Sequence, residues 1–560
     1  MTFKKIYHSI FLFAVFGAVI YPVGAQSLPD AGQTLKDLHN PESGIQFSKP
    51  IIQQPSATQG MTSATPVENT VITVEAITIT GTHAVSSAEL APLVLPWVGR
   101  KLSLSQLNEA ANRITEHYRD LGYLVARAYV PPQVPVNGVV EIAVLEGNIG
   151  SIKLQNTSRL SESGLRKLAS QVMPGEAFNS NQVERGLLLI QDLPGVAAVN
   201  AVLQPGDATG TTDLMVDITG GPLVTGLLDF DNYGNSFTGA YRLGGTVYIN
   251  SPFNLGDQFS IRSQLSNHRL YYGRIAYQTP LGSQGLNAGI AYGVSRYYLG
   301  RQYSELGANG TAKISTLFLS YPIVRTQLFN LTSSLTAEMR QLEDRIDNLG
   351  IANEKTSRQL AATINASRSN HDIAWTASVT YSLGNLAIDS ASERETDEIS
   401  AKTGGHFTKL RYLGNGTLKL SDYWSITGTV NGQLASKNLD SSEKIILGGP
   451  DGVRAYPQGE GAGDEGYLLS AELRYAFAQQ ELGQIQVGGF VDHGGVRINR
   501  NPFLDTANRR HLSAYGVSLN WAPSNKVQVR ASVARRMGSE AVQSDTDSTV
   551  RAWLQAVKSF

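Results

Sequence analysis

The chain contains an arginine and an aspartate, each set among glycines, that could form a specific charge pair. Arg454 lies in LGGPDGVRAYPQGEGAGDEG (residues 447–466), and Asp492 lies in GGFVDHGG. A guanidinium group can donate two parallel hydrogen bonds to one carboxylate. An exposed pair contributes about 0–1 kcal/mol, whereas removing one partner of a shielded pair costs about 3–5 kcal/mol. The residues alone leave open whether the two side chains pair or are solvated separately.

Other groupings in the sequence do not make a catalytic site. The glycines of GAGDEG (461–466) match a nucleotide-binding pattern, but two acidic residues among them would repel a phosphate, and no strand–turn–helix unit surrounds them. His493 follows Asp492, yet adjacent strand residues face opposite sides. The chain has no cysteine, no serine nucleophile elbow, no HExxH and no Walker lysine. We therefore expect no enzyme activity, no metal and no cofactor.

The composition restricts the classes of protein that can carry this pair. The chain has 560 residues, a formal net charge of −1 and 17% charged residues, and it contains 55 glycines. A net charge near zero gives no indication of a nucleic-acid partner. The mean hydropathy of −0.14 excludes a bundle of membrane helices. The length is enough for two to four domains.

The first 70 residues resemble a targeting segment followed by a linker. Lys4 and Lys5 precede the apolar run IYHSIFLFAVFGAVI, and small residues end at Ala25, which predicts a secretory signal at 1–25. Residues 26–70 contain one helix-compatible stretch, LPDAGQTLKDLHN, and a polar, proline-containing remainder that indicates a flexible linker. The sequence leaves open whether the helix plugs a pore or is an ordinary amphipathic segment.

Residues 71–221 have the pattern of two successive α+β modules, 71–147 and 148–221. In the first, the strand VITVEAITITG precedes a helix with apolar residues at helical spacing, which begins with a capping box at Ser103 and Gln106. Two strands, YLVARAYVPP and GVVEIAVLEG, follow. The second module repeats strands around two helices, with a similar cap at Asn179. Each module is predicted to pack helices on a small sheet.

Residues 222–560 alternate in polarity over segments of about ten residues, of which we count about sixteen. In YLLSAELRYAF the apolar row alternates with Glu472 and Arg474. A soluble sandwich also alternates. The length of the segments, the tyrosines and tryptophans near the ends of apolar rows, the predicted export signal and the terminal Phe560 together favour a transmembrane β-barrel with a wet lumen.

The strand around Asp492 has a clear orientation under this hypothesis. In QIQVGGFVD the row that contains Val487 and Val491 would face lipid, so Gly488, Phe490 and Asp492 would face the lumen. Asp492 is thus predicted to be an inward carboxylate, and its wall neighbours Gly488 and Gly489 leave room for another chain. A glycine-rich loop that enters the barrel could bring Arg454 to it.

Several motifs resemble the TpsB family, the outer-membrane transporters of two-partner secretion. The endings of the two modules, GYLVARAYVPPQVPVNGVVEIAVLEGNIGSI and LQPGDATGTTDLMVDI, are similar to POTRA domains of this family. NSPFNLGDQFSI and YQTPLG resemble the first hairpins of its barrel. GGPDGVRAYPQGE resembles its loop-tip motif and GGFVDHGG the paired wall motif. In the loop motif Ala455 stands where the family usually has glycine. The resemblance covers nearly all of the chain after the predicted signal at 1–25.

The resemblance implies a fold and a set of site residues. The fold is an all-β transmembrane barrel of about 16 antiparallel strands, preceded by two α+β POTRA domains. The long loop at about 437–466 would fold into the lumen, where Arg454 would pair with Asp492. This pairing would lock the loop to the barrel wall. The residues implied in the lock and beside it are Val453, Arg454, Tyr456, Asp492, Gly488 and Phe490.

The resemblance also implies a function in the outer membrane of a Gram-negative bacterium. The chain would secrete a large, unfolded, haemolysin- or adhesin-like exoprotein through the barrel, with the POTRA domains in the periplasm, and would act as a monomer in the lipid bilayer. Edge strands of the POTRA sheets would bind the exoprotein as an added strand. The residues predicted on these edges are Val139, Ile142, Val144, Leu214, Val216 and Ile218.

Two other functions are compatible with a barrel. One is a barrel-assembly factor of the same superfamily, which two modules and a proline-containing linker disfavour because such factors usually carry more modules. The other is a passive porin or receptor, for which two modules before the barrel have no evident use.

Overall fold

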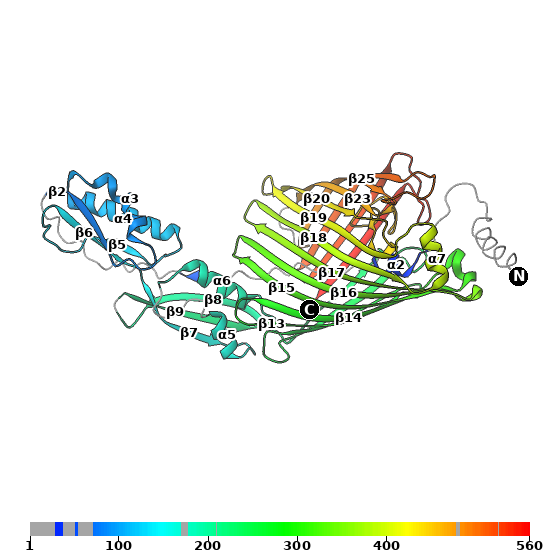
Figure 1. Ribbon diagram of the computed structural model, residues 1–560, viewed down its shortest axis with the longest axis horizontal. Coiled ribbons are helices and arrows are strands. Elements are labelled where there is room, and N and C mark those ends of the chain that lie inside the picture. Colours follow the sequence, from blue (N-terminus) through cyan, green and yellow to red (C-terminus); the bar gives the residue numbers. More distant parts are fainter. Residues whose placement is uncertain are drawn as a thin grey trace.

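The computed structural model describes residues 29–36, 38, 51–53, 71–169, 177–208, 210–477, 482–524 and 526–560. The predicted signal at 1–25 lies outside the described residues, as does most of the predicted linker. Two small α+β domains follow one another at one end of the molecule, and a long β-barrel forms the other end (Figure 1). Among the described residues, no helix has the length and apolar content needed to cross a bilayer.

The first module packs two helices on a small sheet. Its helices are α3 (Ser87–Val94) and α4 (Leu104–Asp120), joined by η1 (Leu95–Trp97). Its main sheet has three strands, β3 (Ala76–Thr80), β6 (Val139–Leu145) and β5 (Arg127–Tyr129), and β2 (Ile72–Val74) and β4 (Arg100–Leu102) form a separate two-stranded sheet. The predicted capping box begins α4, where Ser103 accepts from the backbone of Gln106. The buried face of α4, with Ile114 and Tyr118, packs against Ile142 of β6.

Pro92 lies inside α3, a helix that the sequence did not predict. Proline removes a backbone donor and is tolerated without penalty chiefly in the first turn of a helix. Here Ser86 caps the helix by accepting from Glu89, and the apolar residues Leu90 and Val94 are buried. Burial of this short apolar face therefore outweighs the local penalty of the proline.

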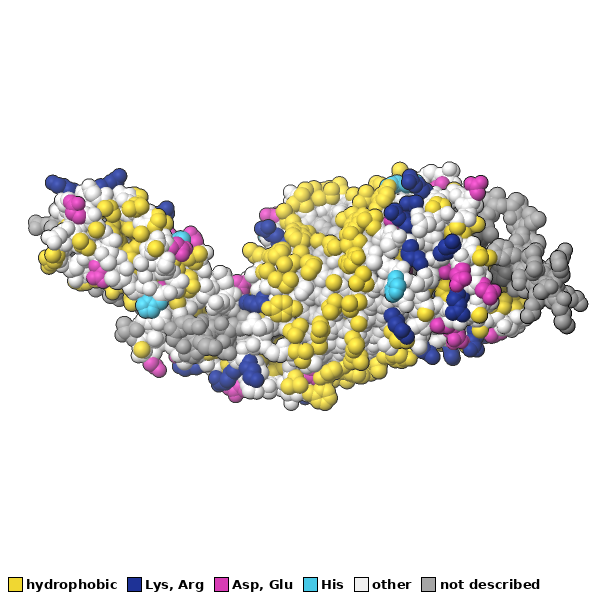
Figure 2. Space-filling model, viewed as in Figure 1, with side chains coloured by type: hydrophobic (Ala, Val, Ile, Leu, Met, Phe, Trp, Pro, Cys, Tyr) yellow, Lys and Arg dark blue, Asp and Glu magenta, His cyan; other side chains and the backbone are white. Residues whose placement is uncertain are grey.

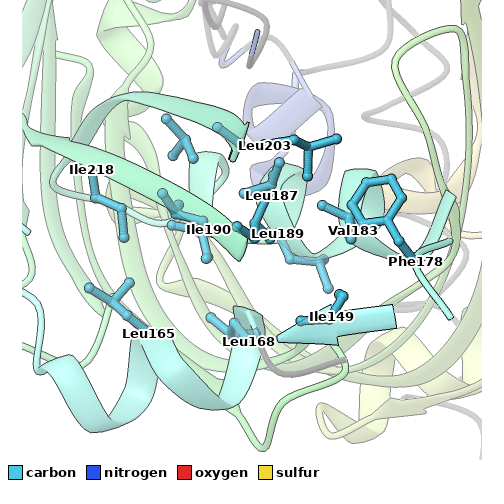
Figure 3. Close-up of a cluster of buried hydrophobic side chains, with 14 of the residues drawn as sticks. Ile149, Leu165, Leu168, Phe178, Val183, Leu187, Leu189, Ile190, Leu203 and Ile218 are labelled. Carbon is cyan, nitrogen blue, oxygen red and sulfur yellow. The ribbon is translucent and has the colours of Figure 1, made fainter. Parts of the chain in front are cut away.

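The second module has helices α5 (Glu162–Ala169) and α6 (Ser180–Gln191) on a sheet of β7 (Asn148–Asn156), β8 (Val196–Pro205) and β9 (Thr211–Gly220). Figure 3 shows its core, in which Leu165 and Leu168 from α5 and Leu187 and Ile190 from α6 lie over the sheet. A strand from the N-terminal segment, β1 (Ile51–Gln53), pairs in parallel with β8. The order in this sheet is β1-β8-β9-β7.

The prediction that β6 and β9 are sheet edges is wrong. β6 lies between β3 and β5, and β9 lies between β8 and β7, so both strands are paired on two sides. The side chains proposed for them mostly face the domain cores, because alternate residues of a central strand lie under the helices. The residues concerned are Val139, which is exposed, and Ile142, Val144, Leu214, Val216 and Ile218, which are buried. Among the described strands, the edges are β3 and β5 in the first sheet and β1 and β7 in the second.

Within the described residues, sixteen antiparallel strands form a closed barrel, which confirms the predicted fold class. The first strand pairs with the last, so the barrel has no open edge. The strands are β10 (Val224–Asp231), β11 (Arg242–Asn250), β12 (Gln258–Ser266), β13 (Tyr271–Leu281), β14 (Leu286–Tyr298), β15 (Ala308–Arg325), β16 (Phe329–Ile346), β17 (Ile351–Ser369), β18 (Ile373–Ile388), β19 (Gly405–Lys419), β20 (Trp424–Ala435), β23 (Glu465–Ala476), β24 (Gln484–Arg497), β25 (Arg509–Ser524), β26 (Val527–Met537) and β27 (Val550–Ser559).

The barrel has an apolar outer belt and a polar lumen. Figure 2 shows the belt on the visible face as a broad band of yellow side chains across the strands. On β15 the outward row Leu317, Leu319, Tyr321 and Ile323 is exposed. The lumen contains a cavity of about 380 Å³ lined by Glu338, Arg340, Gln359, Thr380, Lys409 and Arg411, among others. This polarity is that of a membrane barrel and excludes the sandwich alternative.

The second module is bound to the rim of the barrel by polar contacts. Arg325, at the end of β15, donates two hydrogen bonds of 2.7 Å to the carboxylate of Asp192. Arg185 of α6 donates to the carbonyl of Pro322 at 2.7 Å. Because the chain passes directly from β9 into β10, these contacts hold the module at the end of the barrel where β10 begins.

Short elements cap the opposite end and enter the lumen. They are α2 (Ala31–Lys36), η2 (Arg301–Leu306), η3 (Asp347–Leu349), α7 (Ala391–Ile399), η4 (Ser441–Glu443), β21 (Ile445–Ile446) and β22 (Ala462–Gly463).

Candidate functional site

The loop between β20 and β23, residues 436–464, folds back into the barrel and is called the lumen loop below. Its acidic side chains bind cations on the barrel wall at several points. Glu443 accepts from Arg340 of β16 at 2.8 Å, and Glu460 is bound by Arg510 of β25. Both carboxylates are buried. The loop is therefore held across the lumen by charge pairs with opposite walls.

The tip of the lumen loop is a compact turn that depends on glycine. The backbone of Val453 donates to the carbonyl of Leu447 at 2.7 Å, and that of Gly449 donates to the carbonyl of Tyr456 at 3.1 Å. A Cβ atom on Gly452 would lie 2.1 Å from the carbonyl oxygen of Leu447, so no other residue fits there. This turn presents the side chain at position 454 to the wall.

The structure brings Arg454 into contact with Asp492 of β24. Nε donates to Oδ2 and Nη2 donates to Oδ1, both at 2.9 Å, so the contact is bidentate. The backbone N–H of Arg454 also donates to Oδ2 at 3.1 Å. Ser470 of β23 donates to Oδ1 at 2.7 Å. Asp492 is completely buried, so its charge is compensated by these donors in place of water.

A second carboxylate completes the binding of Arg454. Its Nη1 donates to Oε2 of Glu472 at 2.9 Å. The other oxygen of Glu472 accepts from Arg474 and from Ser518, each at 2.7 Å. Two arginines therefore balance two carboxylates, and the cluster carries no net charge.

Aromatic side chains shield the guanidinium from the lumen. Its central carbon lies 3.2 Å from the ring centre of Phe490, whose side chain is almost fully buried. Trp553 of β27 donates from Nε1 to the carbonyl of Arg454 at 2.7 Å. A desolvated cation–π contact contributes about 2 kcal/mol. The 12% exposure of the Arg454 side chain separates this pair from a solvated surface pair.

This combination of modules, barrel and bound loop matches a known family. The family model of haemolysin secretion/activation proteins of the ShlB/FhaC/HecB type matches residues 210–521, more than half of the chain. The chain belongs to this family. A model of the ShlB-type POTRA domain matches residues 72–147. The resemblance to the TpsB family is thus confirmed. The chain is a TpsB-type transporter of the outer membrane and not an enzyme, and its POTRA domains lie in the periplasm.

Individual relatives are similar over most of the chain. The heme/hemopexin transporter protein HuxB of Haemophilus influenzae is 29% identical over 478 residues, which cover 84% of each chain. The outer membrane transporter CdiB of Dickeya dadantii is 25% identical over 479 residues, which cover 83% of this chain and 80% of the relative. The solved structure of CdiB from Escherichia coli has a TM-score of 0.72 at 20% identity and covers 90% of this chain and 93% of its own.

The remaining predicted site residues of this transporter lie around the loop tip. Val453, Ala455 and Tyr456 are fully buried in one apolar cluster with Phe490, so the alanine at position 455 fits without exposure. The hydroxyl of Tyr456 donates to the carbonyl of Glu540 at 3.3 Å. The apolar cluster therefore anchors the tip on both sides of Arg454.

Gly488 has a different role from the one expected. The sequence suggested that it leaves room for the loop. In the structure an added Cβ would lie 2.8 Å from Oε1 of Glu472 and 2.7 Å from Oγ of Ser518. Glycine at this position therefore makes room for the Glu472–Ser518 hydrogen bond, which in turn fixes the second carboxylate.

His493 faces away from the lumen, as the alternation of the strand predicts. Its ring nitrogens contact the hydroxyl of Tyr467 at 3.2 Å and of Ser513 at 2.8 Å. It therefore makes no acid–base pair with Asp492.

Sequence reasoning missed Glu472 and Trp553 as partners of Arg454. The inward orientation of Glu472 was visible from its place opposite the apolar row of β23. Its contact with the loop follows from register, because Glu472 lies opposite Phe490 and Ser470 lies opposite Asp492. Trp553 is distant in sequence, and no pattern in the chain indicates its contact.

The N-terminal helix α2 also lies inside the barrel of this transporter. The backbone N–H of Ala31 donates to Asp344 of β16 at 2.8 Å. Gly32 packs so closely on the lumen loop that an added Cβ would lie 2.7 Å from Cβ of Ser442. The helix thus contacts both the wall and the loop.

Proposed function

We propose that this transporter secretes one large exoprotein, in an unfolded state, from the periplasm to the cell surface. The observation that supports this proposal most is that two segments of the same chain, the lumen loop and α2, fill a wide polar barrel. The lumen loop and α2 are held by charge pairs and hydrogen bonds, which an entering polar chain or water can replace. A sixteen-stranded barrel without such pieces is wide enough for an aqueous channel.

The resting state would be closed by these two pieces. Arg454 would hold the lumen loop against the wall at Asp492, and α2 would occupy the space between that loop and β14 to β16. Transport would require both to shift, and the polar lining would then keep the backbone of the passing chain solvated. The two pieces touch at Gly32 and Ser442, so the release of one would loosen the other.

The exoprotein would first bind to a POTRA sheet by strand addition. Since β6 and β9 are central strands, the strand that fits this proposal best is β8 in the second module, which becomes an edge when β1 leaves it. Its edge is paired with β1 of the N-terminal segment over three residues, Ile51 to Gln53. A short parallel pairing of this kind is weak, so an extended segment of the exoprotein could displace it and pair along more of β8.

Replacing residues 51–53 by three glycines is expected to free the β8 edge. Amide exchange of Ala201 should accelerate at least tenfold in the folded variant, because its N–H faces β1, whereas those of Asn200 and Val202 face β9, and glycine lowers strand propensity. Hydrogen–deuterium exchange with mass spectrometry measures the change. Three glycines at residues 63–65 serve as the matched control and should leave β8 unchanged. Equal exchange in both variants would contradict pairing by β1.

Deletion of the gene separates this function from the alternatives. We expect one exoprotein to accumulate in the periplasm and to disappear from the medium, while other barrels remain at normal levels. Comparative proteomics of the medium, periplasm and outer membrane measures this. Depletion of many barrels would indicate an assembly factor, and changed uptake of small solutes with normal secretion would indicate a porin.

A further inference from the structure

Cations end the outward apolar rows of three strands, β14, β15 and β17, at the extracellular side of the barrel. On β14 the outward residues Ile290, Tyr292 and Val294 are followed by Arg296, and on β15 the row from Ile323 to Leu317 ends in Ser315 and Lys313. All of these cations are exposed. The same order occurs on β17, where the exposed Arg358 follows Ile364, Ala362 and Leu360 toward the outside.

The strand register places Arg296 and Lys313 side by side, and Arg358 two strands from Lys313 at the level of Ser315. These three cations are called the patch below. Lys313 lies opposite Val294, two residues from Arg296, so the two are diagonal neighbours about 7–8 Å apart. Arg358 lies opposite Met339 and Asn385, and Asn385 lies opposite His406. Figure 2 shows Lys and Arg side chains gathered along the edge of the yellow belt that is farther from the POTRA domains, with histidine among them.

A groove in the apolar belt begins directly below this patch. It has a volume of about 510 Å³ and runs over the outer face of β15 to β19. Its lining includes small and apolar side chains, among them Ala337, together with Arg358 and His406. The residues that matter here are Leu317, Ala337, Met339, Leu360, Arg358 and His406.

The cations of the patch differ from those of the lumen in their partners. Lumen arginines such as Arg242 and Arg454 are bound by carboxylates. Within the part of the chain that the structure describes, Arg296, Lys313 and Arg358 have no carboxylate within salt-bridge distance. The nearby outward carboxylates are Glu343, which lies at the register level of Arg296 and diagonal to Lys313, and Glu354, which lies opposite Glu343.

We propose that this patch and groove bind a phosphorylated lipid of the outer leaflet, with its phosphates on Arg296, Lys313 and Arg358 and an acyl chain in the groove. The depth fits, because phosphate groups of a membrane lipid lie at the edge of the hydrocarbon layer, where the apolar rows end. The charge fits, because cations at a membrane surface that have no carboxylate partner attract anionic lipids. The long side chains reach the headgroup while their stems cover apolar surface.

Binding of lipid A, a glucosamine lipid with two phosphates, tests this proposal on the full-length protein in detergent micelles. Native mass spectrometry counts the lipid that remains bound after delipidation and titration. We expect the triple variant Arg296→Gln, Lys313→Gln, Arg358→Gln to bind at least tenfold more weakly than the native protein. Arg368→Gln is the matched control, because Arg368 is an exposed arginine on the same strand β17 at its periplasmic end. It should bind as the native protein does.

Two further measurements identify the source of the phosphate. Dephosphorylated lipid A should bind at least tenfold more weakly to the native protein, and millimolar inorganic phosphate should not displace the phosphorylated lipid. Equal binding by the triple variant and the native protein would overturn the proposal. Equal binding of the dephosphorylated lipid would also overturn the proposal, because the groove would then bind acyl chains without a headgroup site. Displacement of the phosphorylated lipid by inorganic phosphate would overturn it as well.

Discussion

Replacing Arg454 by alanine is expected to reduce secretion of the exoprotein at least tenfold while the barrel still inserts. The change removes three side-chain hydrogen bonds to two carboxylates, and Asp492 loses both of its bonds to the guanidinium. Asp492 is completely buried, so its charge would be left with a serine and a backbone N–H. Loss of one partner of a buried pair costs about 3–5 kcal/mol, which is enough to release the loop tip from the wall.

Asp492→Asn should have a smaller effect than Arg454→Ala. Glu472 would still bind Arg454 at the other edge of the guanidinium, and Ser470 could still contact the amide at position 492. Immunoblots of medium and periplasm measure secretion, and heat-modifiable migration of the barrel measures insertion. Arg500→Ala is the control, because Arg500 binds Glu465 at 3.0 Å but is 42% exposed, and exposed pairs contribute about 0–1 kcal/mol. Secretion at the native level by the Arg454→Ala variant would show that transport does not require the contact between Arg454 and Asp492.

A charge exchange between positions 454 and 492 should not restore secretion. Glu472 stays fixed by Arg474 and Ser518, and it would face the new carboxylate of an Arg454→Asp chain. The site is a cluster of four charges, and an exchange of one pair leaves a like-charge contact with the other.

The sequence was sufficient for the features that depend on alternation within one strand. The outward row with Val487 and Val491 and the inward row with Phe490 and Asp492 follow from a period of two residues, and the structure has both. The capping box at Ser103 is equally local. These predictions hold because the interactions that determine them span only a few residues.

The predictions that failed depend on which strands lie side by side. GVVEIAVLEG and DLMVDIT have the alternation of ordinary strands, and nothing within them indicates a central or an edge position. Their place in the sheets results from crossovers, such as the parallel pairing of Ala76 to Thr80 with β6. The contact of Arg454 with Glu472 has the same origin, since it requires the register of β23 against β24.

Removal of the N-terminal segment is expected to have the second large effect, on the conductance of the channel. Deletion of residues 26–70 takes α2 away from Asp344 and from the lumen loop, and water can then enter the space that it filled. We expect a several-fold larger or longer-lived conductance in planar bilayers, since the lumen loop alone would remain to obstruct the barrel. Unchanged conductance would show that the segment only tethers the chain.

A single substitution, Gly32→Leu, should reproduce this effect. Because the linker stays in the chain, this variant distinguishes displacement of the helix from loss of the linker. Gly32→Leu places a side chain where Ser442 of the loop already lies, with its Cβ 2.7 Å from both Cβ and the backbone nitrogen of that residue. Such contacts are not tolerated, so α2 must leave or the loop must move. Gln33→Leu is the matched control, because Gln33 borders a cavity that can hold the new side chain. If Gly32→Leu and Gln33→Leu conduct alike, close packing of helix and loop does not close the channel, and the resting barrier must be formed by the loop that Arg454 holds.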